Sequence, residues 1–247
     1  MLRFLAGGCL TRWFVDRHSV RLVIMVVLLA VSARFAPQSS LAQTDSVTVC
    51  ASECDHQTIQ AAIDDPSTDA GDTIRVLDAI HTEAGITVNK SVVIVGMSAS
   101  GTIVQAETQG TLADSRVFRI ESSTAVTIQD MTIRHGRTTG SPAQGGGILN
   151  EGGLMLERVA VTDNLAVGSR GYPGGAAEGG GIYNNGSLVL VSSVVSNNDA
   201  EAGDGSSSGA DGGDSHGGGI ANGTGGTLTL INSTISGNAA TGGFGFG

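Results

Sequence analysis

The chain has 247 residues and a net charge of −10, with 38 glycines, 4 prolines and only 4% aromatic residues. Glycine shows no every-third-residue period, which excludes collagen, and a hydrophobic content of 40% argues against a disordered chain. Thirty of the glycines follow Thr139, so we look for repeats in the C-terminal half.

Residues 1–42 have the features of a signal peptide. Arginines precede an apolar run from Leu22 to Ala33, and Ser40-Leu41-Ala42 follows as a small-x-small cleavage site. A retained membrane anchor is the alternative, but the run is shorter than the about 20 residues that span a bilayer. We expect export to a secreted, cell-surface or outer-membrane location, with no transmembrane helix in the mature chain.

Removal of residues 1–42 leaves 8 Lys and Arg against 22 Asp and Glu, a net charge of −14. Affinity for nucleic acid depends on basic side chains that neutralise phosphates, so we expect no nucleic-acid partner. The same charge repels polyanions such as pectate unless a divalent cation bridges the two.

Cys50 and Cys54 are the cysteines of the expected mature chain. In an oxidising compartment such a pair predicts a disulfide. A zinc site with His56 would lack a fourth ligand. We interpret residues 43–71 as a disulfide-stapled N-terminal cap.

A short helix is expected within the cap, over residues 55–64. Ile59, Ala62 and Ile63 share one helical face, and either Asp55 or Thr58 can act as the N-cap. After the helix the period changes, and short β-rich runs separated by turn residues cover residues 73–76, 86–88, 92–95 and 102–104.

An explicit repeat begins at Gly145. Gly-Gly-Gly-Ile occurs at residues 145–148, 179–182 and 217–220, and each copy is followed by a Leu-x-Leu pair and closed by an asparagine: Asn164, Asn198 or Asn238. Residues 126–136 form a degenerate earlier copy, with Gly136 in the asparagine position. Four successive units therefore share one register.

The β-rich runs are three to five residues long with two-residue alternation, which is too short for a meandering sheet. Each residue type recurs once per unit, so identical side chains must stack above one another. This pattern predicts an all-β fold over residues 72–247: a right-handed, single-stranded parallel β-helix with a short N-terminal capping helix. Asn164, Asn198 and Asn238 are expected to form a buried hydrogen-bonded ladder. The glycine triplets would allow positive φ or close backbone approach.

The motifs from Thr58 to Gly96, T-I-Q-A-A-I-D, G-D-T-I-R-V and G-I-T-V-N-K-S-V-V-I-V-G, resemble the first coils of the pectin-lyase-like superfamily. The Gly-Gly-Gly-Ile units resemble bacterial surface β-helix repeats of the chlamydial polymorphic outer-membrane protein type, although Val161, Val195 and Ile235 stand where that family has Phe. The resemblance covers about residues 47–247 and implies the fold. Its matching residues are structural.

The catalytic motifs of the pectin methylesterases, pectate lyases and polygalacturonases are missing, and Ser215-His216-Gly217 only half-matches a polygalacturonase motif. The register sets His216 level with Glu178 and Gln144, a variable position. We therefore assign no catalytic, cofactor-binding or metal residues.

Two constellations have a structural and a functional interpretation. The register places Asp130 beneath Arg158 and His135 beneath Asp163. The functional interpretation is that they form acid/base pairs, and the structural one is that they make cross-strand salt bridges or hydrogen bonds. A Gly/Ser-rich stretch contains five acidic residues: Asp199, Glu201, Asp204, Asp211 and Asp214. The functional interpretation is a Ca²⁺ site, and the structural one is a solvated flexible loop.

The connecting segments 137–144, 165–178 and 199–216 lengthen from coil to coil and leave the same corner, so they should cluster on one side. The sequence ends as if before another glycine triplet, which suggests a longer protein. Together these features predict an exported, non-catalytic module that binds a polysaccharide or a host-cell surface ligand, or that has a structural role. The alternative is a polysaccharide lyase or hydrolase.

Overall fold

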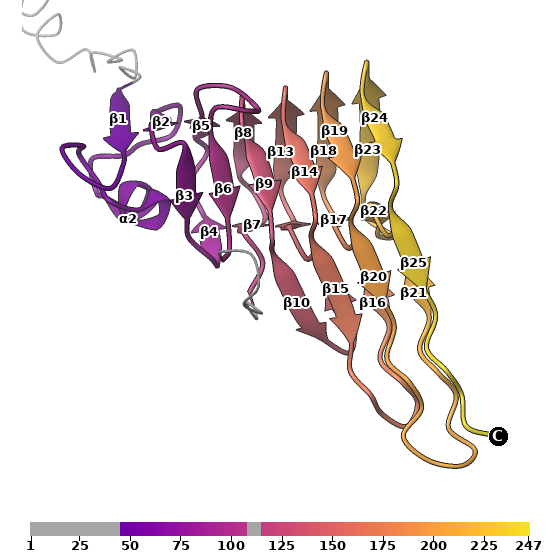
Figure 1. Ribbon diagram of the computed structural model, residues 1–247. Coiled ribbons are helices and arrows are strands. Elements are labelled where there is room, and N and C mark those ends of the chain that lie inside the picture. The colour runs from indigo at the N-terminus through magenta and orange to yellow at the C-terminus, as the bar shows by residue number, and fades with distance from the viewer. Residues whose placement is uncertain (1–44, 108–114) are drawn as a thin grey trace, which may run out of the picture. The chain divides into compact units, whose positions relative to one another are not determined.

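The computed structural model describes residues 45–107 and 115–247, and the predicted signal peptide lies outside them (Figure 1). Within the described residues, α2 (Ile59–Asp64) is the single α-helix and the remaining regular elements are short strands. The strands stack in parallel sheets along one direction, so the predicted all-β solenoid of repeated coils is confirmed at that level.

Each coil passes through three sheets in the same order. Sheet A contains β1 (Ser46–Val49), β2 (Thr73–Val76), β5 (Val93–Val95), β8 (Ala125–Gln129), β13 (Gly153–Glu157), β18 (Ser187–Val191) and β23 (Thr227–Ile231). Sheet B contains β3 (Ile80–Thr82), β6 (Ile103–Gln105), β9 (Thr132–Arg134), β14 (Ala160–Thr162), β19 (Val194–Ser196) and β24 (Thr234–Ser236). Sheet C contains β4 (Ile86–Val88), β7 (Phe118–Ile120), β12 (Ile148–Asn150), β17 (Ile182–Asn184) and β22 (Ile220–Asn222).

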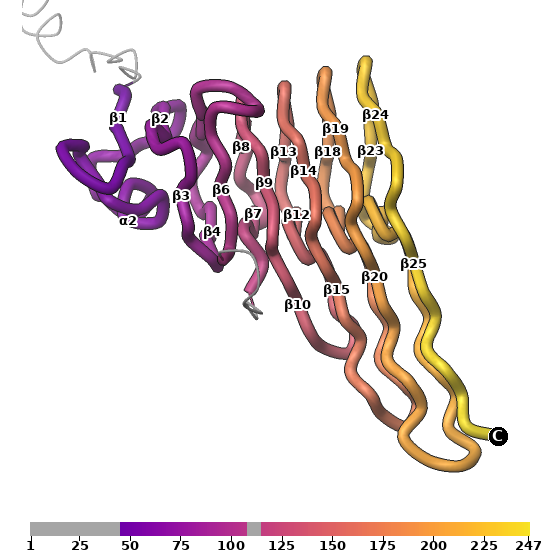
Figure 2. The backbone as a smooth tube through the Cα atoms, in the orientation of Figure 1, coloured from indigo at the N-terminus to yellow at the C-terminus, as the bar shows by residue number. Residues whose placement is uncertain are grey.

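From β9 onwards the coils also enter a projection that we call the wing. Its outgoing strands form sheet D, with β10 (Arg137–Gly140), β15 (Leu165–Gly168), β20 (Asp199–Glu201) and β25 (Ala239–Thr241). Its returning strands form sheet E, with β11 (Ala143–Gln144), β16 (Ala177–Glu178) and β21 (Ser215–His216). The wing leaves the stacked coils on one side and reaches further in later coils (Figure 2).

The register of the repeat is the predicted one. Leu154 pairs with Val126 on one side and with Leu188 on the other, so the degenerate copy is confirmed as a full coil. Alternate residues of each strand face inwards, and the inward aliphatic side chains stack as ladders of buried residues. Burying such side chains contributes about 1.5–3 kcal/mol each, which makes these ladders the main stabilising element.

Sheets A and B are joined at a single residue with positive φ in successive coils: Asp130 (55°), Arg158 (55°), Ser192 (49°) and Asn232 (49°). A second such column stands between sheet B and the wing: His135 (55°), Asp163 (55°), Asn197 (54°) and Gly237 (64°). The left-handed region turns the chain sharply within one residue, and Asn, Asp and Gly tolerate it best. At both columns a two-residue connection, one residue of which has a positive φ, therefore takes the place of a longer loop.

The glycine triplets combine both predicted roles. Gly179 has a φ of 68°, and the next glycine, Gly180, lies so close to the backbone of Asp199 and Gly218 that a Cβ atom would overlap them. Only glycine fits a position where two backbones approach this closely.

The predicted asparagine ladder is present. Asn164 and Asn198 are buried, with 2% and 0% of their surface exposed, and their side chains hydrogen-bond along the stack towards Asn238. A second ladder was not predicted: Asn150 donates to Asn184 at 2.7 Å, and Asn184 donates to Asn222 at 2.6 Å. The sheet C strands β12, β17 and β22 thus end in asparagine, and the other column follows two residues after the sheet B strands β14, β19 and β24.

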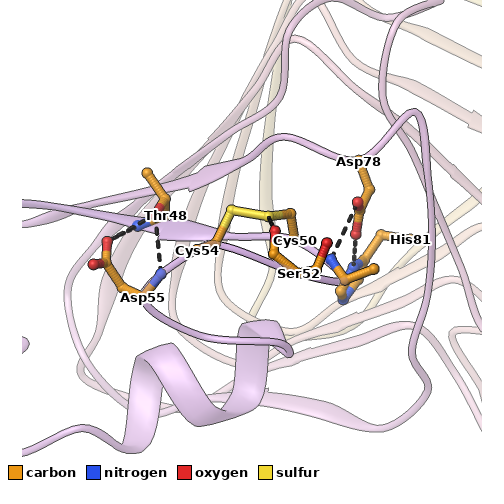
Figure 3. Close-up of a disulfide and its surroundings, with 8 residues drawn as sticks. Thr48, Cys50, Ser52, Cys54, Asp55, Asp78 and His81 are labelled. Atoms are coloured by element: carbon orange, nitrogen blue, oxygen red, sulfur yellow. Dashed lines mark hydrogen bonds and ion pairs between the residues drawn. A yellow bond between two sulfur atoms is a disulfide. The ribbon is translucent and has the colours of Figure 1, made fainter.

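The N-terminal segment contains the predicted disulfide between Cys50 and Cys54, with a Cα–Cα distance of 5.6 Å (Figure 3). Thr58 is the N-cap of α2, because its hydroxyl accepts from the N–H of Ala61 at 3.1 Å. The other candidate, Asp55, instead accepts hydrogen bonds from Thr48 of β1. Sheet A begins at β1 and therefore within segment 43–71.

The helix buries the predicted face, formed by Ile59, Ala62 and Ile63, and packs against β1, β2 and β4. Near the start of the helix, one inward position of sheet B is occupied by an imidazole. His81 pairs with Val104 of β6, and only 5% of its surface is exposed. Its ring nitrogens lie 3.2 Å from Oδ2 of Asp78 and 2.8 Å from Oε2 of Glu83.

The wing is paired structure, which corrects the expectation of a solvated loop at residues 199–214. Near the stacked coils its two layers enclose four buried alanines, Ala143, Ala166, Ala177 and Ala200. Further out the layers are joined directly by backbone hydrogen bonds, from Gly203 to Gly175, from Gly213 to Gly203 and from Gly243 to Gly213, at 2.8–3.0 Å. Such direct contact between layers requires residues without side chains.

Candidate ligand-binding face

Two rows of side chains run along the stack where sheet C meets sheet E. The middle residues of the sheet C strands are aligned by register as Thr87, Arg119, Leu149, Tyr183 and Ala221. The last residues of the sheet E strands are aligned as Gln144, Glu178 and His216. We call these two rows together the groove face. Since successive coils are about 4.8 Å apart, the rows follow the long direction of the stack.

Two hollows lie on this face. The first, of about 220 Å³, is lined by Gly85, Thr87, Ser115, Arg116, Arg119 and Thr138. The second, of about 390 Å³, is lined by residues of β16, β17, β21 and β22, among them Glu178, Tyr183 and His216. Concave sites that hold a few placed polar groups are where ligands bind on a rigid scaffold.

The second hollow brings together three titratable groups. Glu178 accepts a hydrogen bond from the amide of Gln144 at 2.7 Å, and His216 is the register neighbour of Glu178 in the next coil. Burial, followed by the negative charge of Glu178, raises the pKa of the Tyr183 hydroxyl, which therefore stays protonated at neutral pH. Tyr183 can thus donate a hydrogen bond to a ligand and offer its ring for stacking.

His216 has the position that the register predicted, level with Glu178 and Gln144. Its side chain is exposed at the end of β21 and lines the second hollow. The register therefore predicted the place of His216, but not the hollow beside it, which Tyr183 and the loop after β22 also line.

Of the two predicted cross-coil pairs, one forms through side chains. Arg158 donates from Nε and Nη2 to the two carboxylate oxygens of Asp130 at 2.7 and 2.9 Å, and it also pairs with Glu157. Hydrogen bonds from Arg158 hold the pKa of Asp130 below its usual value. This is the cross-strand ion pair of the structural interpretation.

The second pair meets only through the main chain. The N–H of His135 donates to the carbonyl of Asp163 at 3.1 Å, while the His135 ring lies near the carbonyl of Glu107 and the Asp163 carboxylate accepts from Thr162. Backbone geometry therefore explains this juxtaposition.

The acidic side chains of residues 199–214 are spread along the wing. Asp204 accepts a hydrogen bond from the N–H of Phe244 at 2.8 Å. Across residues 45–107 and 115–247, no three His, Cys, Asp or Glu side chains come together as ligands for a metal ion. The same residues include no helix with the length and apolar character needed to cross a membrane.

The groove face was missed by sequence reasoning, although a signal for it existed. The recurring residue types lie in the inward columns, whereas the outward residue between Ile148 and Asn150 changes from coil to coil. Following it would have placed Arg119, Leu149 and Tyr183 in one row. The hollows themselves depend on the wing, whose geometry no sequence column indicates.

Comparison with known proteins finds no match among protein-family models, curated proteins or solved structures. The family resemblance of the motifs therefore stays a prediction from the sequence.

Proposed function

We propose that the protein is an exported, right-handed β-helix of the pectin-lyase-like type that acts at the cell surface or as a secreted protein, as a non-catalytic binding module. The groove face is the single observation that carries this proposal. It offers polar and aromatic side chains at a spacing of about 4.8 Å per coil, over a rigid stack, to a ligand that lies along it. An extended saccharide chain fits such a row because it presents a hydroxyl-rich, repeating surface.

The proposal is tested by binding of the purified protein to neutral and charged oligosaccharides on a glycan array, followed by calorimetry with each compound retained. We expect Tyr183→Ala to weaken binding by tenfold or more, because a half-buried ring and its hydroxyl contact the ligand directly. The matched control is Tyr172→Ala, since Tyr172 is 68% exposed and lies in the wing. Equal losses in the two variants, or no saccharide retained, would contradict the proposal.

One observation favours the alternative of a polysaccharide lyase or hydrolase. Glu178, Tyr183 and His216 line the same hollow, and groups of these types supply general acids and bases. The test is incubation with polygalacturonate and methylated pectin, with and without Ca²⁺, from pH 5 to 9. We expect no cleavage products from the binding module. Products that absorb in the ultraviolet and disappear in Glu178→Gln would establish the alternative.

A further inference from the structure

The first hollow of the groove face is lined by two of the few basic side chains of an acidic protein. From residue 43 to the end, the chain has 8 Lys and Arg against 22 Asp and Glu, yet two of those arginines line this one hollow. The other lining residues are Thr87, Ser115 and Thr138, which carry hydroxyls, and Gly85. Among the residues that the structure describes, the lining thus contains two guanidinium groups and three hydroxyls, and no carboxylate.

Arg116 is held in place by neutral acceptors. Its Nη2 donates to the hydroxyl of Thr138 at 3.2 Å and to the carbonyl of Gln144 at 3.1 Å. Among the residues that the structure describes, none accepts a hydrogen bond from its Nε or Nη1 and no carboxylate forms an ion pair with it. A guanidinium has five N–H donors, so Arg116 retains donors for a ligand.

The surroundings disfavour the positive charge of this side chain. Burial lowers the pKa of Arg116, the neighbouring charge of Arg119 lowers it further, and Glu151 opposes the effect. A partly buried cation without a charged partner is costly, and an anion in the hollow would remove that cost.

Arg119 provides the second cation. Its Nε and Nη2 donate to Oε2 of Glu151 at 3.1 and 2.9 Å, and Glu121 lies 3.1 Å from Nε. Neither glutamate lines the hollow. The two carboxylates therefore orient the guanidinium from outside the hollow.

From this arrangement we propose that the first hollow binds an oxyanion group, with Arg116 and Arg119 as its charged donors and the hydroxyl of Thr138, which accepts from Arg116, as a neutral one. Arginine pairs with planar or tetrahedral oxyanions through two parallel hydrogen bonds, which suits carboxylate, sulfate and phosphate alike. The inference names the chemical class of ligand for the groove face and so rests on the proposed binding function. A saccharide that carries one such group would lie with its charge at β7 and its neutral part towards Tyr183.

The test uses sodium sulfate, phosphate and acetate as probes, titrated by calorimetry into the full protein, with sodium chloride added to keep the ionic strength constant. We expect saturable binding of at least one probe, and the one that binds identifies the group. Arg116→Gln and Arg119→Gln should each weaken it by about tenfold or more, because each removes a charge-assisted hydrogen bond. The exposed Arg75 lies on β2, away from the hollow, so Arg75→Gln is the matched control and should bind as the parent does.

Absence of saturable binding for all three probes, or equal binding by Arg119→Gln and Arg75→Gln, would overturn the inference. Arg119 is 45% exposed, so its variant gives a readout even if Arg116→Gln fails to fold. Neutral saccharides that bind through Tyr183 without any oxyanion binding would leave the proposed function standing and remove only the oxyanion site. Oxyanion binding without any saccharide binding would leave the oxyanion site standing and contradict the proposed saccharide-binding function.

Discussion

Asn164 donates a hydrogen bond from its Nδ2 to Oδ1 of Asn198 at 2.9 Å, one coil further along the stack. The same oxygen accepts from the backbone N–H of Asn164 at 3.1 Å, and the amide nitrogen of Asn198 donates to the carbonyls of Val161 and Ser196. The amide of Asn198 thus joins its own coil to the preceding one. A side chain at this position therefore needs both a hydrogen-bond donor and an acceptor.

Asn198→Leu should lower the free energy of unfolding by about 1–3 kcal/mol or more, because it leaves buried donors and acceptors of the neighbouring coils unpaired. Asn185→Leu is the matched control, since Asn185 is exposed and its φ is ordinary; it should cost within about 0.5 kcal/mol. Asn197 does not serve as a control, because its φ of 54° would strain a leucine. Denaturant midpoints compare the variants, and equal losses would contradict the ladder.

His81 should make stability depend on pH. Burial alone would lower its pKa, but hydrogen bonds to Glu83 and Asp78 outweigh burial and raise it. A folded-state pKa above the unfolded value of about 6.5 means that this stabilisation is complete below pH 6.5 and is lost as the pH rises through the folded-state pKa. We expect the unfolding free energy to fall over this alkaline range, measured by urea denaturation in steps from pH 6 to 9.

The pH effect should be local to the N-terminal region. Glu83 also accepts hydrogen bonds from the N–H groups of Ile59 and Gln60, so it joins His81 to the start of α2. His81→Gln should flatten the pH dependence, and His216→Gln, a change at an exposed position, should retain it. An unchanged slope in His81→Gln would show that other groups cause it.

Gly180→Ala should be strongly destabilising, by about 1–3 kcal/mol or more, because its Cβ would overlap the carbonyl oxygen of Asp199. Gly153→Ala is the matched control: there the nearest atom to a Cβ is 3.4 Å away, which is ordinary contact, and we expect little change. Thermal midpoints of the two variants give the comparison. Similar midpoints would mean that the wing and the coils are not packed as closely as described.

The inward half of this structure could be predicted from the sequence and the outward half could not. Leu154 and Leu188 recur at the same place because a stacked core admits only aliphatic side chains there, so the spacing of such residues determined the register. His81 was missed because its carboxylate partners, not its hydrophobicity, allow it an inward position. Arg119 and Tyr183 were missed because outward positions tolerate any residue and show no recurring type.

The disulfide should contribute modestly to stability. Cys50 and Cys54 close a loop of only a few residues, for which the loop-entropy relation gives about 2 kcal/mol. The double variant Cys50→Ser, Cys54→Ser should still fold, because the hydrogen bonds between Thr48 and Asp55 hold the segment. Its unfolding midpoint should lie at a lower denaturant concentration than that of the parent. Thiol counting by mass spectrometry on exported protein should find no free thiol at either position, and two free thiols would contradict the pairing.

The wing has a consequence for how such a protein can change over generations. Because Gly203, Gly213 and Gly243 join its layers through their own backbones, a point mutation to a larger residue is excluded at its interior. Its length can still change, because an insertion that adds glycine to an outgoing and a returning strand together preserves the pairing. Insertions and deletions then change the length of the wing while the stacked coils retain their register. The wing can therefore diversify without destabilising the coils.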